Sequence, residues 1–286
     1  MGADTGFDPA REHERTRAAL ASATARLGRL LDAATDLDVP SGLPGWSVGD
    51  TAAHLAAVHL AYSAAASAEP VDWSGLLPAG EDGLLAERIA AVNAGAITLF
   101  DAEQRARSGE FIAERTAVFL DGTADQSPET PIATPWYGPD RSLTLAAATG
   151  LLLSETLLHG LDIARGTGTA WPIGRDEAAL VLGQAIPAMM PLALDHARAR
   201  GVRRSFDLAF AGGPRLSVVV ADGAMTVTRD APPRAHDCRI AADPVTFLLV
   251  SFKRAPMWKA IATGRMRAGG RRPWLATSLS KLVATP

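Results

Sequence analysis

Residues 142–166 read SLTLAAATGLLLSETLLHGLDIARG, and this stretch decides which fold the chain can adopt. Its leucines and alanines recur at steps of three and four residues, the spacing that gives an α-helix a continuous apolar face. Glu155 and His159 stand four residues apart within it, so their side chains project from the same side of the helix about one turn apart. The stretch therefore predicts a long, partly buried helix that carries a pair of polar side chains.

The spacing of Glu155 and His159 allows the two side chains to hold one metal ion together. Asp162, three residues further on, continues the same stripe and could orient the ligand histidine. A third ligand could come from His54 on an earlier helix, because bundles build metal sites between facing helices. Two histidines and one carboxylate leave a position for water or substrate, as in catalytic zinc sites. An ordinary hydrogen-bonded Glu–His pair has the same spacing, so spacing alone leaves both interpretations open.

Three more residues need an interpretation. Arg165 is a candidate for contact with an anionic substrate, with an ion pair to Asp162 as the alternative. His59 lies five residues beyond His54, about 140° around a helix, so we expect it to face away from the metal as a wall or solvent-facing histidine. Cys238 falls in a predicted strand, where a cysteine is more often a small buried side chain than a nucleophile.

Helical patterns surround the central stretch on both sides. Apolar periodicity predicts helices over residues 11–37, 47–68, 84–107, 111–120 and 176–200. Ser47 and Asp50 have the spacing of a capping box, and Ser142 is expected to cap the central helix. Pro187 and Pro191 should kink or split the last of these helices. Residues 122–141 are rich in turn-forming residues and predict a surface loop.

After Gly201 the apolar period changes from about 3.6 to 2, which indicates strands. Strands are predicted near residues 206–210, 216–220, 225–227 and 238–240, and helices over 244–253, 256–263 and 273–283. Asp222-Gly223 is a typical two-residue hairpin turn. The arginine-rich residues 265–272 are expected to form a solvated turn between helices, with binding of a carboxylate of the substrate or of a thiol cofactor as the alternative. We therefore expect a helical domain over residues 1–200 and an α+β domain over residues 201–286.

Composition limits the function classes. The chain has 28 Lys and Arg against 31 Asp and Glu, a net charge of −3, which argues against binding to nucleic acid or an anionic membrane. Its single cysteine excludes an internal disulfide and a cysteine-rich zinc cluster. Residues 1–17 lack the apolar core of a signal peptide, and no uncharged run of about 20 apolar residues reads as a membrane span. We expect a cytoplasmic protein.

Two separated motifs resemble one known family. GWSVGDTAAHLA at residues 45–56 resembles the helix that supplies the first histidine ligand in mycothiol-dependent maleylpyruvate isomerase-like proteins, which have a DinB-like metal-binding four-helix bundle. LLLSETLLHGLDIARGTG at residues 151–168 resembles their second motif, Glu-x-x-x-His followed by Gly-x-Asp. The resemblance implies that His54, Glu155 and His159 bind the metal, the same three residues that the spacing on one helix and the bundle argument suggest.

The second part of the chain resembles the sterol-carrier-protein-like domain that often follows this bundle. The segments that carry this likeness are SFDLAF, DGAMTV, DCRIAADPVTFLLVSF and AIATGRMRAGGRRPWLATSL. The combined fold expected is therefore α followed by α+β, a DinB-like four-helix bundle with a C-terminal sterol-carrier-like α+β domain.

The resemblance implies a zinc ion whose open position meets a low-molecular-weight thiol, which is mycothiol in actinobacteria. The expected activity is isomerisation of a small electrophilic metabolite, or transfer of the thiol to it. Two alternatives remain open. The protein could bind an apolar small molecule or lipid on a degenerate enzyme scaffold, or it could use metal-bound water as a hydrolase or lyase that needs no thiol.

Overall fold

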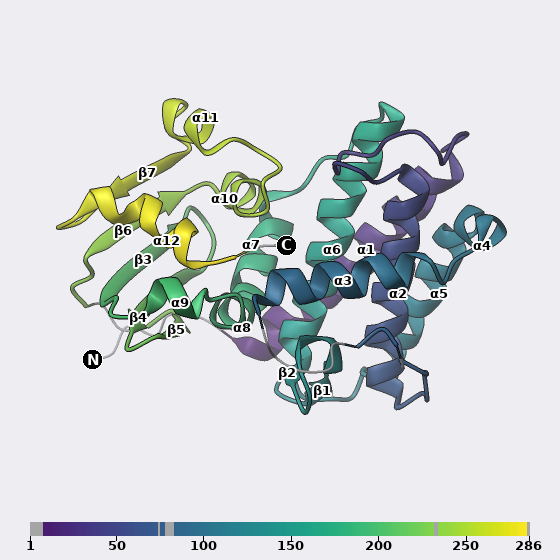
Figure 1. Cartoon of the computed structure of the whole chain (residues 1–286), viewed down its shortest axis with the longest axis horizontal. Coiled ribbons are helices and arrows are strands. Elements are labelled where there is room, and N and C mark those ends of the chain that lie inside the picture. Colours follow the sequence, from purple (N-terminus) through teal and green to yellow (C-terminus); the bar gives the residue numbers. More distant parts are fainter. Residues whose placement is uncertain (1–7, 74, 78–82, 232–233, 285–286) are drawn as a thin grey trace. The chain divides into compact units, whose positions relative to one another are not determined.

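The computed structural model describes residues 8–73, 75–77, 83–231 and 234–284 (Figure 1). Contacts divide the chain into two compact units. One unit comprises Pro9–Asp82 and Arg88–Ile173, and it is helical apart from one small hairpin. The other holds Gly174–Pro286 with short earlier segments, and it contains a five-stranded sheet. The predicted order, a helical part followed by an α+β part, is confirmed.

Four long helices form the bundle of the first unit: α1 (Pro9–Asp32), α2 (Val48–Ser67), α5 (Ser108–Gly122) and α6 (Leu145–Thr167). Helices α1 and α2 each pack against both α5 and α6, so α1 and α2 lie diagonally opposite each other. Their shared core includes Leu27, Leu55, Ile112 and Ile163, all at most 1% exposed. Because α2 and α6 are neighbours, side chains on their facing sides can meet inside the bundle.

Local capping explains where two of these helices begin. The Ser47 side chain accepts from the backbone N–H of Asp50, while Asp50 accepts from the backbone of Ser47, which confirms the predicted capping box of α2. The predicted cap of α6 at Ser142 is wrong. Ser142 lies in β2 (Ser142–Thr144), which pairs with β1 (Pro131–Ala133), and Thr144 caps the helix through the N–H of Ala147.

The connections between the long helices hold more structure than expected. The predicted helix over residues 84–107 is two helices, α3 (Leu85–Ile97) and α4 (Ala102–Ala106), because Asp101 forms a new capping box with Gln104. The predicted loop at residues 122–141 contains strand β1 and the short helix η1 (Pro135–Tyr137). These irregular segments bring aromatic residues to the bundle.

The sheet of the second unit has the strand order β5-β4-β3-β6-β7, with β3 and β6 parallel and the other neighbours antiparallel. Its strands are β3 (Arg204–Phe210), β4 (Arg215–Ala221), β5 (Ala224–Arg229), β6 (Cys238–Ala242) and β7 (Met266–Gly269). Asp222 and Gly223 both have positive φ at the β4–β5 turn, which confirms the predicted hairpin. The predicted turn at residues 265–272 is wrong in part, because β7 forms there against β6.

Three short helices replace the long pattern predicted over residues 176–200. These are α7 (Arg175–Gln184), α8 (Ile186–Leu192) and α9 (His196–Ala199). A break at Pro187 is confirmed, since this proline stands in the first turn of α8, whereas Pro191 lies inside that helix and does not split it. Leu182, Ile186 and Met190 belong to the same apolar core as the strands, so the compact units divide at Ile173 and Gly174 rather than near Gly201. The sequence predicts that these helices have apolar faces, but it does not show against which of the two cores those faces pack.

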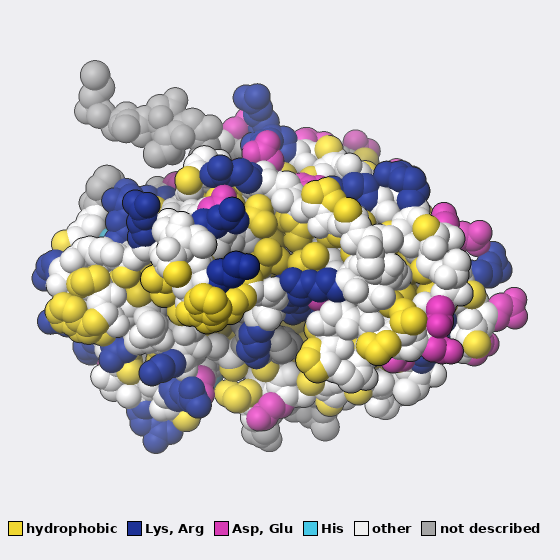
Figure 2. Space-filling view, turned by 90° about the horizontal axis from the view of Figure 1, so that it is seen from above, with side chains coloured by type: hydrophobic (Ala, Val, Ile, Leu, Met, Phe, Trp, Pro, Cys, Tyr) yellow, Lys and Arg dark blue, Asp and Glu magenta, His cyan; other side chains and the backbone are white. Residues whose placement is uncertain are grey.

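The remaining elements of the sheet unit are α10 (Pro244–Ser251), α11 (Met257–Ala262), η2 (Pro273–Leu275) and α12 (Ala276–Leu282). None of the helices in the described part of the chain is long and apolar enough to cross a membrane. On the face in view in Figure 2, Lys and Arg side chains are interrupted by apolar and other polar side chains.

Candidate metal centre

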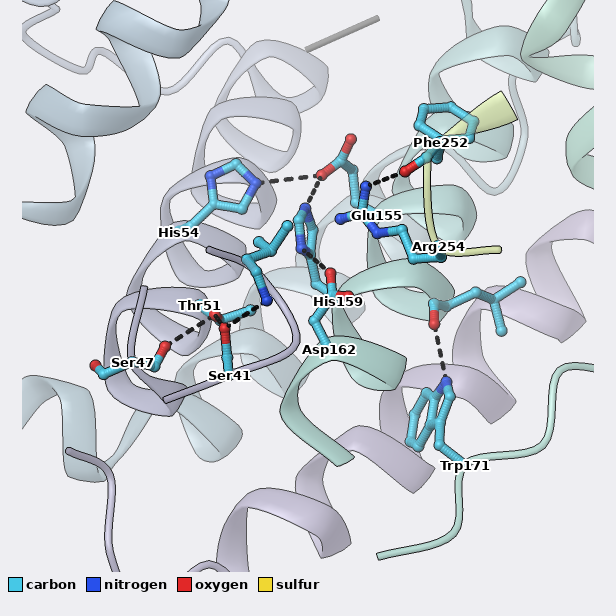
Figure 3. A network of polar contacts seen from close by, with 12 residues as sticks. Ser41, Ser47, Thr51, His54, Glu155, His159, Asp162, Trp171, Phe252 and Arg254 are labelled. Carbon is cyan, nitrogen blue, oxygen red and sulfur yellow. Dashed lines mark hydrogen bonds and ion pairs between the residues drawn. The ribbon is translucent and has the colours of Figure 1, made fainter. Parts of the chain in front are cut away.

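Helices α2 and α6 bring three potential ligands together inside the bundle (Figure 3). His54 comes from α2, while Glu155 and His159 stand one turn apart on α6. The Nε2 atoms of His54 and His159 lie 3.2 and 3.1 Å from the same oxygen of Glu155, Oε2. One ligand atom from each residue lies within 4.8 Å of the others. The structure thus unites the three residues that the sequence singled out.

Burial and hydrogen bonding fix the charges of this cluster. Burial alone would raise the pKa of Glu155, but hydrogen bonds with His159 and His54 hold that pKa well below its usual range. Burial alone would lower the pKa of His159, but hydrogen bonds to Asp162 and Glu155 raise it. The Glu155 side chain is 30% exposed against 4% for His54, so the carboxylate marks the accessible side of the cluster.

Asp162 holds His159 from behind. Its side chain is fully buried, and its Oδ2 lies 3.1 Å from Nδ1 of His159. A histidine whose Nδ1–H donates to a carboxylate presents its Nε2 lone pair to a metal, the usual arrangement around metal-bound imidazoles. The backbone carbonyl of Asp162 also accepts from the N–H of Gly42, which fixes the loop before α2 against α6.

Trp46 lies against both histidine rings, a position that the sequence did not predict. Its ring stands edge-on to His54 at 5.2 Å and nearly parallel to His159 at 6.4 Å between centroids. The loop is held by a hydrogen bond from the N–H of Ser41 to the Trp46 carbonyl and by one from Thr51 Oγ1 to Ser41 Oγ. The signal was present in the motif at residues 45–56, where Trp46 directly precedes the helix cap.

The donor set itself tests whether a metal would fit. Two imidazoles and one carboxylate are the protein ligands of many catalytic zinc sites, which keep a further coordination position open. The buried carboxylate of Asp162 supplies the outer partner that such histidines normally have. His54, Glu155 and His159 therefore fit a divalent metal ion.

Comparison with known proteins identifies the family of the helical unit. The sequence model of the family "Mycothiol maleylpyruvate isomerase N-terminal domain" matches residues 17–164, which include all three ligand candidates. The chain belongs to this family. No curated protein matched the sequence in the corresponding search.

Two solved structures show the fold that this family member shares. The crystal structure of the mycothiol-dependent maleylpyruvate isomerase is 15% identical, covers 94% of this chain and 96% of that chain, and gives a TM-score of 0.50. A histidine-to-alanine variant of that isomerase gives 14% identity, the same coverage and a TM-score of 0.52. The likeness shows the same succession of a helical region and a sheet-containing region.

Two further candidates, Arg165 on α6 and His59 on α2, are not among the three residues whose ligand atoms lie together. Arg165 is exposed at the end of α6, where its side chain passes beside Gly42, and its role as an anion contact stays a prediction. His59 is fully buried, so the expectation of a wall or solvent-facing histidine is wrong. Its Nδ1 lies 2.8 Å from Oγ1 of Thr116 and its Nε2 lies 3.2 Å from Oγ1 of Thr156. Burial lowers the pKa of His59 to about 4, so the ring is neutral.

A cavity of about 90 Å³ reaches the ligand cluster within the bundle unit. His54 and Glu155 line one part of it, and aromatic residues from α2 and the irregular segments line the rest: Tyr62, Trp73, Trp136 and Tyr137. The hydroxyl oxygens of Tyr62 and Tyr137 lie 3.1 Å apart. Sequence reasoning assigned Trp73 no role and interpreted Trp136 as a core or loop anchor, because nothing in an irregular segment tells which cavity it borders.

Proposed function

We propose that this family member is a metal-dependent enzyme that uses a low-molecular-weight thiol, mycothiol, to isomerise a small electrophile or to transfer the thiol to it. The observation that carries the proposal is the cluster of His54, Glu155 and His159 at the edge of a cavity. A structural metal site closes all its positions with protein ligands, whereas three ligands beside a cavity suit a catalytic ion, with zinc the expected metal.

Each residue of the cluster would have a separate role. A bound divalent ion would supply the positive charge that keeps a thiol sulfur deprotonated near neutral pH. Glu155 balances part of that charge, Asp162 fixes the orientation of His159, and Trp46 covers both imidazole rings. The thiolate adds to an electrophilic double bond of the acceptor and forms a sulfur–carbon bond. In an isomerase this bond breaks again after rotation and regenerates the thiol, whereas in a transferase a proton adds to carbon and the bond persists.

The chain's own thiol is a poor candidate for this chemistry. Cys238 is fully buried in β6 of the sheet unit, and burial raises the pKa of its thiol. A buried, protonated thiol is neither a metal ligand nor a nucleophile. The reacting thiol is therefore a second substrate.

Metal content and thiol dependence test the proposal. We expect the purified protein to hold about one divalent ion per chain by elemental analysis, and the His159→Ala variant to lose it. His196→Ala is the matched control, since His196 is exposed and its Nδ1 lies 3.0 Å from the carbonyl of Gly223 in the sheet unit. Unchanged metal content in His159→Ala would contradict the ligand assignment. Turnover that persists without any added thiol would favour a hydrolase or lyase instead.

A further inference from the structure

The cavity beside the ligand cluster has walls that select a class of acceptor. We propose that the acceptor is an uncharged conjugated carbonyl compound, whose flat apolar part lies beside Trp136 and whose carbonyl oxygen accepts a hydrogen bond from the Tyr62–Tyr137 pair. This inference rests on the proposed function for the reaction. Residues of the chain alone form the cavity, so binding to it can be measured on metal-free protein.

The walls of the cavity are apolar and aromatic. Helix α2 contributes small side chains such as Ala61, and α3 contributes Ile89 and Val92. The Trp136 ring stands edge-on to Tyr62, with ring centroids 5.0 Å apart, and Trp73 lies 6.5 Å from it. Aromatic walls in this arrangement bind a flat, π-bearing group through stacked or edge-to-face contacts.

The charges around the cavity argue against a dicarboxylate. Among the described residues that line it, Glu155 is the one charged side chain, and it is negative. A dicarboxylate such as maleylpyruvate would bring two negative charges to a cavity whose described lining includes neither Lys nor Arg, so at least one carboxylate would lack a cationic partner from these residues. Burying an unpaired carboxylate is costly, whereas a neutral acceptor meets no such penalty.

The two tyrosines supply the polar contact that a neutral acceptor needs. When two hydroxyls pair, one donates to the other, and the second keeps a proton for a further acceptor. Burial raises the pKa of Tyr62 well above its ordinary value and that of Tyr137 to about 12, so both stay protonated and donate. Replacement of both tyrosines by phenylalanine removes the two hydroxyls and leaves the apolar walls in place.

A hydroxyl donor at this position also suits the thiol addition. As the sulfur lone pair forms a bond to the β-carbon, the electron pair of the carbon–carbon double bond shifts through the α-carbon and places negative charge on the carbonyl oxygen. A donor aimed at that oxygen stabilises the charge. When a proton adds to the α-carbon, the enolate electron pair forms the new carbon–hydrogen bond. When the sulfur leaves instead, that pair re-forms the carbon–carbon double bond and the sulfur departs as thiolate.

The experiment measures binding of three probes to metal-free protein by ligand-observed NMR titration. The probes are 2-cyclohexen-1-one, cyclohexene as its carbonyl-free counterpart, and maleate as the dicarboxylate. We expect cyclohexenone to bind at least ten-fold more tightly than maleate. In the double variant Tyr62→Phe/Tyr137→Phe, the Kd for cyclohexenone should rise about three- to ten-fold, the usual worth of one hydrogen bond, while that for cyclohexene stays within two-fold.

A second pair of variants tests the location. Ala61→Leu adds bulk to the cavity wall and should weaken both neutral probes, whereas Ala66→Leu on the same helix lies outside the lining and should not. Maleate binding as tight as cyclohexenone binding, or unchanged affinities in the tyrosine double variant, would overturn the proposal. If cyclohexenone binds as expected but the His159→Ala variant keeps its full metal content, the ligand assignment and with it the proposed function fail, and the acceptor class stands. If the protein turns over a dicarboxylate with thiol but does not bind cyclohexenone, the acceptor class fails and the proposed function stands.

Discussion

His54 and His59 are both buried on α2, five residues apart, yet the bundle gives them opposite environments. His54 faces a carboxylate and a second imidazole on α6, and its ring borders the cavity. His59 faces two threonine hydroxyls, one on α5 and one on α6, and is fully enclosed. Both histidines contact α6 through adjacent residues, Glu155 and Thr156. The neighbouring side chains, rather than burial or residue type, separate a candidate metal ligand from a structural histidine.

The two environments differ in their charge and in their access to solvent. The hydroxyls of Thr116 and Thr156 are held at 2.7 Å by the carbonyls of Ile112 and Leu152, so the His59 contacts tie three helices together. The ligand cluster instead concentrates negative charge, from Glu155 and from Asp162 behind His159, next to an opening. A cation can neutralise the second arrangement, whereas the first carries no net charge.

The largest expected effect is a crossover between His54→Ala and His59→Ala. Four-ligand zinc sites bind with roughly 10–16 kcal/mol, so loss of one ligand should lower metal affinity a few hundred-fold in His54→Ala. His59→Ala should keep its affinity within about three-fold but lose about 2–4 kcal/mol of unfolding free energy, because it leaves a cavity and removes the contacts of the ring with Thr116 and Thr156. Metal titration and urea unfolding of the metal-free proteins measure the two effects. Loss of metal binding in a folded His59→Ala variant would erase the distinction.

The next effect concerns pH and belongs to His59. The pKa of this histidine is about 4 in the folded protein against an ordinary 6.5, so between these values the unfolded chain binds the extra proton. Stability therefore falls as pH drops from 6.5 towards 4, by about 3 kcal/mol from this residue. The His59→Gln variant lacks that contribution, so its unfolding free energy should change less over the same range. Parallel curves for the two proteins would show that the ring is already charged or exposed.

The sequence predicted the elements whose signals are local. The capping box at Ser47 and the spacing of Glu155 and His159 depend on residues a few positions apart, and the structure has both features. Strand β7 was missed because four residues, two of them exposed, form no visible alternation until β6 pairs with them. Ser142 was misassigned for a related reason, since its partner strand β1 begins eleven residues earlier.

The candidate site follows the same rule. His54 was joined to α6 by reasoning about bundles and by family resemblance, because a contact 101 residues apart leaves no mark in spacing. The environment of His59 could not be read, since its threonine partners sit on two other helices. The cavity depends on Trp73, Trp136 and Tyr137, which lie in irregular segments whose course is set by tertiary packing. Such residues become visible only once the helices are placed.

The smallest expected effects come from the residues that hold each histidine in place. Asp162→Asn keeps the shape but removes the charge behind His159, and outer partners of metal-bound histidines are typically worth 10- to 100-fold in affinity. We expect a loss of about ten-fold, with unfolding free energy nearly unchanged. Thr116→Val removes a hydroxyl from His59 instead, and should cost about 1 kcal/mol of stability without changing metal affinity. If Asp162→Asn bound metal as the natural chain does, the orientation of His159 would depend on α6 packing alone. Glu155 would then be the single carboxylate that distinguishes the environment of His54 from that of His59.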